Sequence, residues 1–151
     1  MPKTLTCDWK TSKGKGNPSL KTRLIKHRCN YTWKGIKIER YKSDDSTWFN
    51  ASRRVLTGTY GEKTRFHVRY FQIAPQGYTT LERHRHEHVV VGIRGRGLCR
   101  VNGKSYRIGF LDTLYIEPHA GHQLKNPYNE PFGFFCLVDA KRDKPKVLKG
   151  R

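Results

Sequence analysis

From Phe66 onward, the hydrophobic residues of this chain fall into short runs that are separated by Gly, Pro and Asn. Such runs, rich in β-branched and aromatic residues, are typical of β-strands. The pair Asn102-Gly103 is the strongest hairpin signal, because Asn and Gly tolerate the positive φ angles of a tight turn. No window has the periodicity of a convincing helix. The sequence therefore predicts an all-β fold, an antiparallel sandwich or barrel.

The expected strands follow from these runs. Residues 66–73 form the first core strand, and Pro75-Gln76-Gly77 turns the chain into a long strand over residues 78–93. Later strands are expected at residues 98–101, 105–108, 112–116, 123–125 and 132–138. The even spacing of these short strands is typical of an antiparallel sandwich or barrel.

Four side chains that can bind a metal ion occur in and after the long strand. Glu82, His84 and His88 share one parity, so on a strand they point to the same face. His122 supplies another imidazole later in the chain. Carboxylate and neutral imidazole together suit zinc, iron, manganese, nickel or copper. The sequence therefore predicts that Glu82, His84, His88 and His122 bind one divalent transition metal ion.

Several neighbouring residues are expected to have other roles. His86 shares the parity of the ligands and is expected to contact them or the substrate. His119 is expected to be an exposed turn residue, and Glu87, of opposite parity, to face away from the metal. Arg69 and Tyr78 are candidates for binding a substrate carboxylate, since Arg offers a bidentate fork.

The spacing of the ligands resembles the first motif of the cupin superfamily, which runs His, any residue, His, three or four residues, Glu, six residues and Gly. The match is Glu82-x-His84-x3-His88-x6-Gly95. Its two outer ligand types are exchanged, so that Glu comes first and His comes third.

The second cupin motif resembles residues 111–126, where His122 lies four residues before Asn126. The Pro and Gly that usually precede this His are replaced by Glu117 and His119. The resemblance covers residues 66–139. It implies a cupin-type antiparallel double-stranded β-helix, a jelly-roll barrel, with an N-terminal extension.

The resemblance implies a metal-dependent enzyme that acts on a small, anionic metabolite. Three His and one Glu leave open positions on iron or manganese, which favours oxidation of the dioxygenase type. With zinc, four protein ligands could close the site. The alternatives are a zinc-dependent non-redox cupin, which rearranges amino-acid adducts to form a nitrogen–nitrogen bond or acts as an isomerase or lyase, and a non-catalytic binding protein.

The net charge of +19 indicates attraction to anions. The basic residues are most concentrated at the two ends, which predicts a basic arm over residues 1–20, a single domain over residues 21–140 and a basic tail over residues 141–151. Trimming both ends is expected to leave the fold and the metal content unchanged. A nucleic-acid-binding module is less favoured, because no base-reading motif is visible and the basic residues are spread out.

Other expectations concern location and assembly. No stretch has the length of a membrane span, and the four cysteines form no CxxC pair, so a cytoplasmic protein without a membrane partner is expected. Cys136, in an apolar run, is expected to be a buried thiol. Residues 31–38 are expected to form an edge strand that covers the sheet and exchanges between the chains of a homodimer. Trp48 and Phe49 are expected to plug one end of the barrel.

Overall fold

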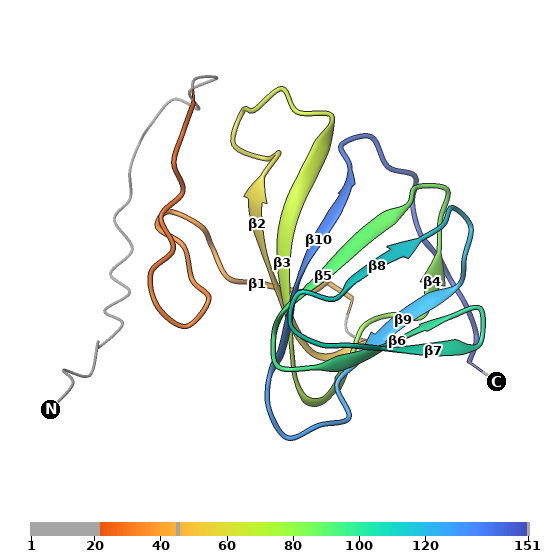
Figure 1. The fold of residues 1–151 in the computed structure, drawn as a ribbon. Helices are drawn as coiled ribbons and strands as arrows, with labels where there is room; N and C mark the ends of the chain where they lie inside the picture. Colours follow the sequence, from red (N-terminus) through yellow and green to blue (C-terminus); the bar gives the residue numbers. More distant parts are fainter. Residues whose placement is uncertain (1–21, 45, 151) are drawn as a thin grey trace, which may run out of the picture.

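The computed structural model describes residues 22–44 and 46–150, and within them it contains strands but no helix (Figure 1). The strands are β1 (Glu39–Arg40), β2 (Phe49–Thr57), β3 (Phe66–Tyr78), β4 (Glu82–Arg83), β5 (His88–Arg94), β6 (Gly97–Val101), β7 (Lys104–Ile108), β8 (Thr113–Ile116), β9 (His122–Lys125), β10 (Phe132–Asp139) and β11 (Lys146–Val147). Every pairing between them is antiparallel. The predicted all-β, jelly-roll class is confirmed.

The strands build a nearly closed barrel. Their continuous order is β11-β4-β9-β3-β10-β5-β8, while β2 pairs with β3, and β6 pairs with both β7 and β9. Strand β10 is central, because it pairs along most of its length with β3 on one side and β5 on the other. Segments far apart in the sequence therefore meet around a common interior.

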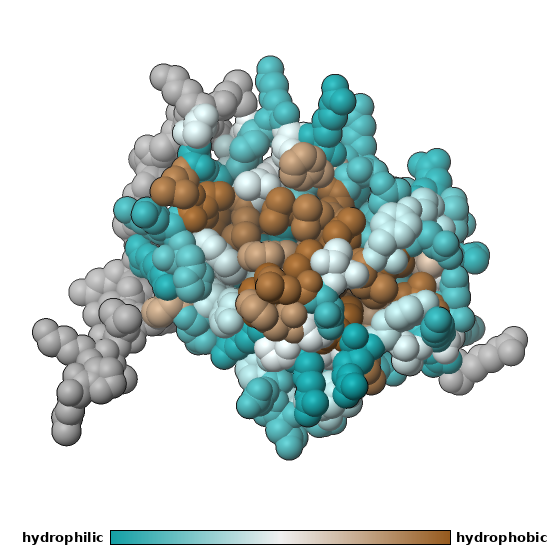
Figure 2. Space-filling view, in the orientation of Figure 1, coloured by the Kyte–Doolittle hydropathy of each residue, from teal (hydrophilic) through white to brown (hydrophobic). Residues whose placement is uncertain are grey.

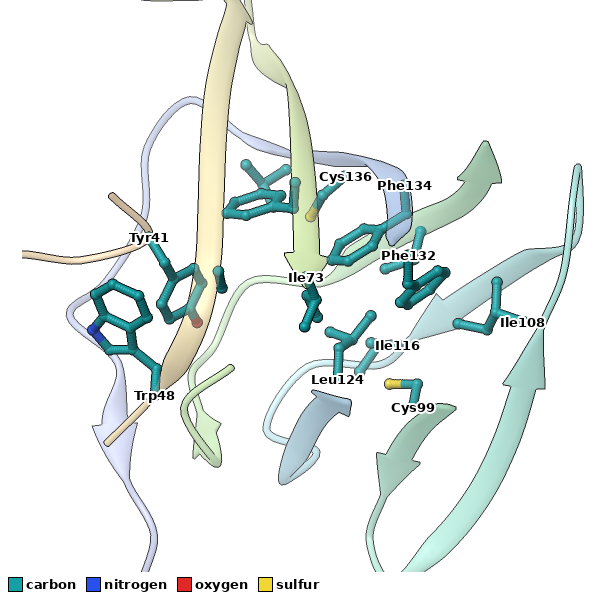
Figure 3. Packing of buried hydrophobic residues seen from close by; sticks show 14 of the residues in the cluster. Tyr41, Trp48, Ile73, Cys99, Ile108, Ile116, Leu124, Phe132, Phe134 and Cys136 are labelled. Carbon is teal, nitrogen blue, oxygen red and sulfur yellow. The ribbon is translucent and has the colours of Figure 1, made fainter. Parts of the chain in front are cut away.

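The hydrophobic core fills much of this interior. In Figure 3, Ile73 and Phe134 lie on one side of the core and face Ile116 and Leu124 on the other side. The rings of Phe71 and Phe134 stack with their centroids 5.6 Å apart. Inward apolar residues alternate with outward ones along β10, as expected for a strand with one face in the core. Several of these side chains also line the cavity described below.

Two turns depend on backbone conformations that the sequence encodes locally. Asn102 and Gly103 have φ angles of 46° and 84° and join β6 to β7, which confirms the predicted hairpin. Gly95 has a φ of 59°, and a Cβ atom there would lie 2.3 Å from the carbonyl oxygen of Pro131. Only glycine fits this position of the predicted cupin motif.

The predicted turn at residues 75–77 is wrong, because β3 continues through it to Tyr78. The register between β2 and β3 shifts opposite this segment, and Gln76 has a φ of 66°. Proline is tolerated at such a bulge, where no ladder hydrogen bond is required of it. The backbone N–H of Gln76 donates to the carbonyl of Asn126, which ties the bulge to the end of β9.

The predicted strand over residues 78–93 is interrupted. β4 ends at Arg83, a bend follows at residues 85–86, and β5 begins at His88. Strand β2 was not predicted at all. Its polar residues, among them Asn50, Arg53 and Arg54, obscure the alternation that normally reveals a strand.

The N-terminal segment does not form the predicted strand over residues 31–38. It makes an isolated bridge between His27 and Trp33, and the Trp33 ring packs on Tyr70 and Phe135 with centroids 5.2 and 6.2 Å away. Trp48 belongs to the core, whereas neighbouring Phe49 is half exposed at the start of β2, so the predicted plug does not include Phe49. The proposed arm over residues 1–20 lies outside the described residues.

The C-terminal segment takes part in the sheet. β11 pairs with β4, and the N–H of Leu148 donates to the carbonyl of Leu81 over 2.9 Å. The segment is basic, as predicted, but it packs beside the strand that leads to the predicted ligands. We therefore no longer expect that trimming residues 141–151 leaves the metal content unchanged.

Candidate metal centre

Three buried imidazoles meet inside the barrel. His84 follows β4, His88 begins β5 and His122 begins β9. The three residues are 4%, 8% and 5% exposed, and one ligand nitrogen from each lies within 4.8 Å of the others. The structure thus brings together three of the four side chains that the sequence selected as ligands.

The alternation that the sequence predicted around these residues is present. Glu82, His84, His86 and His88 are buried, whereas residues 83, 85 and 87 are exposed. The alternation survives the bend between β4 and β5, so strand parity predicted the correct face although the strand is broken. Glu87 is exposed, as expected.

Hydrogen bonds fix the orientation of each ring. Nδ1 of His84 lies 2.8 Å from the carbonyl oxygen of His86, and Nδ1 of His122 lies 2.9 Å from that of Ala120. Because a carbonyl can only accept, both Nδ1 atoms carry the proton, which leaves Nε2 as a free lone pair. Nδ1 of His88 contacts Sγ of Cys136 at 3.1 Å. As predicted, Cys136 is buried, and burial raises the pKa of its thiol.

The imidazoles are held in the neutral form. Burial lowers the pKa of His84, His88 and His122, and neighbouring imidazoles lower it further. A neutral imidazole is the form that coordinates a metal. The cluster is therefore prepared for coordination without first having to release protons at neutral pH.

The donor set fits a divalent transition metal. Nε2 of His84 and Nε2 of His88 face each other at 2.8 Å. Two lone pairs at this distance repel each other unless a proton or a cation lies between them. Neutral imidazole suits zinc, copper, iron and nickel, so the chemistry of these residues agrees with the predicted cofactor.

Glu82, the predicted fourth ligand, lines the same cavity as the three histidines. It is 7% exposed, and its Cα is paired with that of His122 across β4 and β9. Its carboxylate forms an ion pair with the ammonium group of Lys42. Coordination by Glu82 remains a prediction, since the compact cluster consists of the three histidines.

The cluster opens into a cavity of about 220 Å³. Arg69 and His86, both predicted to contact substrate, line it. Tyr78 does not. The tyrosine is 39% exposed, and its ring packs near Phe49 with centroids 6.3 Å apart. The odd–even alternation of residues along a strand could not predict the direction of the Tyr78 side chain, because the bulge in β3 precedes Tyr78 and interrupts that alternation.

Asp143 is a residue of this site that sequence reasoning missed. Its Oδ1 atom lies 3.0 Å from Nδ1 of His86, and its two carboxylate oxygens accept from the backbone N–H of Arg85. The hydrogen bond from Arg85 is the largest cause that lowers the pKa of Asp143. No local pattern marks this residue, which lies within the basic segment that follows β10.

His119 is exposed with a φ of 66°, which confirms the predicted turn. Its side chain is not part of the cluster. Its backbone N–H nevertheless donates to the carbonyl of His84 over 2.7 Å. The turn before β9 therefore supports the chain at His84 without providing a ligand.

An antiparallel jelly-roll barrel that gathers three inward-facing histidines defines a β-barrel protein whose interior could hold a metal ion. A cupin domain is recognised over residues 69–138. The chain belongs to the cupin family.

The chain is similar to 1-methylthio-D-xylulose 5-phosphate methylsulfurylase of Rhodospirillum rubrum. The two are 37% identical over 121 residues, which cover 78% of this chain and 74% of the relative. This relative is named as an enzyme that acts on a phosphorylated sugar.

Solved structures show the same architecture. A cupin-2 domain protein of Rhodospirillum rubrum matches with a TM-score of 0.73 and 33% identity, covering 82% of each chain. A cupin 2 conserved barrel protein of Rhodopseudomonas palustris matches with a TM-score of 0.77 and 30% identity, covering 84% of this chain and 87% of that one. Over residues 22–44 and 46–150, no helix is long and apolar enough to cross a membrane.

Proposed function

We propose that this chain is a metal-dependent cupin enzyme that acts on a small anionic metabolite, with a phosphorylated, methylthio-bearing sugar as the first candidate. The proposal is carried by the neutral imidazole cluster at a cavity. It is supported by 37% identity to a methylsulfurylase.

His84, His88 and His122 would hold the ion through Nε2, and Glu82 is the proposed fourth ligand. A bound divalent metal supplies a Lewis acid or a redox centre. Because the Glu82 carboxylate is paired with Lys42, coordination by Glu82 and this ion pair would compete. Lys42 also lines the cavity, so its ammonium group could compensate negative charge on a substrate.

His86 is the cavity imidazole outside the three-histidine cluster. Its Nδ1 atom is held by Asp143, and its Nε2 atom makes no hydrogen bond to the described residues. We propose that Nε2 of His86 contacts the substrate. The fixed ring would orient the substrate at little entropic cost, because the imidazole is already immobilised.

The relative's substrate guides the choice of the first compound to test. In 1-methylthio-D-xylulose 5-phosphate, the methylthio group is on C1 beside the C2 ketone, and the phosphate is at the other end. A cavity of about 220 Å³ suits a metabolite of this small size better than a nucleotide.

The metal site could catalyse either of two classes of reaction, an oxidation or a non-redox reaction. Oxidation of the dioxygenase type is the class that the sequence favours. A non-redox reaction is supported by the relative's substrate, because a Lewis acid polarises a ketone without any change of oxidation state. A nucleic-acid role is not proposed, while a cytoplasmic location and a homodimeric state remain proposals.

The experiment loads the purified chain separately with manganese, iron, nickel and zinc. Each form is incubated with 1-methylthio-D-xylulose 5-phosphate, with and without air, and substrate consumption is followed by proton NMR. We expect consumption that depends on the metal and is lost in His122→Ala. Oxygen uptake would favour oxidation, and equal rates without air would favour the non-redox reaction. If no metal-loaded form consumes the compound, the proposed substrate is wrong.

A further inference from the structure

Three arginine side chains line the cavity, and we call them the arginine wall. They are Arg53 of β2, Arg69 of β3 and Arg142, which follows β10. These strands are neighbours, since β3 pairs with β2 on one side and with β10 on the other. Arg53 and Arg69 therefore lie on adjacent strands, and Arg142 follows the strand on the other side of β3, near enough for the charges of both to act on it.

Two of these guanidinium groups have only neutral hydrogen-bond partners among the described residues. Arg142 donates from Nη1 to the carbonyl of Asp139 over 2.6 Å and contacts Nδ1 of His67 at 3.1 Å. Arg69 donates from Nη2 to Sγ of Cys136 over 3.4 Å, while its buried Nε–H has no partner. Arg53 differs, because its Nε atom forms an exposed ion pair with Glu39.

The carboxylates on the cavity lining are engaged elsewhere. Glu82 is paired with Lys42, and Asp143 accepts from the backbone of Arg85 and contacts His86. The positive charges of Arg69 and Arg53 consequently act on Arg142. Burial and the charges of Arg69 and Arg53 lower the pKa of Arg142. A bound anion would remove this repulsion.

The arginine wall adjoins the imidazole cluster. Sγ of Cys136 is contacted both by Nη2 of Arg69 and by Nδ1 of His88. A single sulfur atom thus separates the arginine from one predicted ligand. A small substrate anchored at the arginine wall could extend its carbon skeleton over the cluster.

We propose that Arg53, Arg69 and Arg142 form a phosphate-binding subsite, and that the physiological ligand is a small sugar or polyol phosphate. The orientation of that ligand toward the histidines rests on the proposed function. Planar guanidinium groups present paired N–H donors, which match the oxygens of a phosphate group. The limited cavity volume selects a short carbon chain.

Calorimetry on the metal-loaded full chain tests the subsite with three probes: inorganic phosphate, D-xylulose 5-phosphate and unphosphorylated D-xylulose. We expect the sugar phosphate to bind at least about tenfold more tightly than the free sugar. Arg142→Gln and Arg53→Gln should each weaken its binding by about tenfold. Arg142→Lys keeps the charge but loses the planar fork, so it should fall between wild type and Arg142→Gln.

Arg107→Gln is the matched control. Arg107 is exposed on β7, so this substitution removes one positive charge, as Arg142→Gln does, but outside the cavity. It should bind the sugar phosphate like wild type. The subsite would be overturned if Arg107→Gln and Arg142→Gln bound D-xylulose 5-phosphate with equal affinity while both variants kept the metal content and circular dichroism spectrum of wild type. Equal binding of phosphorylated and free sugar by wild type would also overturn it.

The outcome is independent of the proposed reaction. If D-xylulose 5-phosphate binding depends on the arginines but the methylthio compound is not consumed, the subsite stands and the proposed function fails. If the compound is consumed with the same KM in wild type and Arg142→Gln, the proposed function stands and the subsite fails.

Discussion

The imidazole of His86 lies flat against the imidazole of His84, with ring centroids 3.6 Å apart and 1° between the ring planes. Asp143 holds His86 through Nδ1 and holds the backbone of Arg85 through both carboxylate oxygens. The bend that carries His84 toward the cluster is therefore fixed by a carboxylate from the C-terminal segment.

The first prediction concerns this carboxylate. Asp143→Ala should lower the metal affinity by about 10-fold, the lower end of the usual loss when a ligand loses its support. The reason is that Asp143 holds His86, whose carbonyl accepts from Nδ1 of His84. Competition with a coloured chelator measures the affinity. Asp112→Ala is the control, because the Asp112 carboxylate also accepts from a backbone N–H, that of Gly109, but lies outside the cavity. If both variants bind metal like wild type, Asp143 does not position the site.

The second prediction tests the ligands themselves. His84→Ala and His122→Ala should each abolish stoichiometric metal, because either change removes one of three converging nitrogens. His119→Ala should retain it, since the His119 side chain is exposed and contributes only its backbone N–H. Elemental analysis of the purified variants gives the metal-to-chain ratio. Equal loss in all three variants would contradict the assignment.

Some features of the site depend on local geometry and could be predicted from the sequence, whereas others depend on contacts between distant residues. Alternating burial from Glu82 to His88 depends on local geometry, so residue parity identified the correct face. The bend and Asp143 were not predictable in the same way, because the contact between Asp143 and His86 joins residues 57 positions apart. The position of Tyr78 outside the cavity was not predictable for a related reason: the bulge at Gln76 is stabilised by Asn126, which is distant in sequence.

The third prediction asks whether Glu82 is a ligand. Glu82→Gln should weaken metal binding if the carboxylate coordinates, while Glu87→Gln should not, because Glu87 is exposed on the same stretch. Lys42→Met should maintain or strengthen metal binding, since it frees the carboxylate from its ion pair. Titration with zinc in competition with a chelator compares the variants. Unchanged affinity in Glu82→Gln would restrict the protein ligands to the histidines.

The fourth prediction is a pH dependence. Burial lowers the pKa of His84, His88 and His122 in the folded chain. The unfolded chain binds protons at these residues near the ordinary His pKa of about 6.5, whereas the folded chain resists protonation. The free energy of unfolding of the metal-free protein should therefore decrease as pH falls below about 6.5.

Urea unfolding of the metal-free protein at pH 7.5 and pH 5.5 measures this decrease. His88→Gln should show a smaller decrease than wild type, because one buried imidazole is missing. His119→Gln should behave like wild type, since His119 is exposed. A stability that is the same at both pH values would show that the buried imidazoles are readily protonated.

The fifth prediction arises from the outer face of the barrel. Figure 2 shows hydrophobic residues gathered over β10 and β5, with less hydrophobic residues between them and toward β8. Val68, Leu137, Val89 and Tyr115 are successive cross-strand neighbours there, and Tyr115 is 59% exposed. β8 ends the strand order within the described residues, so its outer backbone edge lacks a paired strand. An apolar face beside a free edge is suited to pairing with another chain.

We therefore predict a homodimer that buries this face, with a mass by light scattering of twice the 17.7 kDa of one chain. Tyr115→Lys should shift the protein toward the monomer, because it places a charge in the apolar face and beside the free edge of β8. Phe49→Lys is the control, since Phe49 is similarly exposed but lies at the start of β2. Trp33 packs on its own barrel, so the contact does not require exchange of residues 31–38. A mass of one chain for the wild type at micromolar concentration would exclude the dimer.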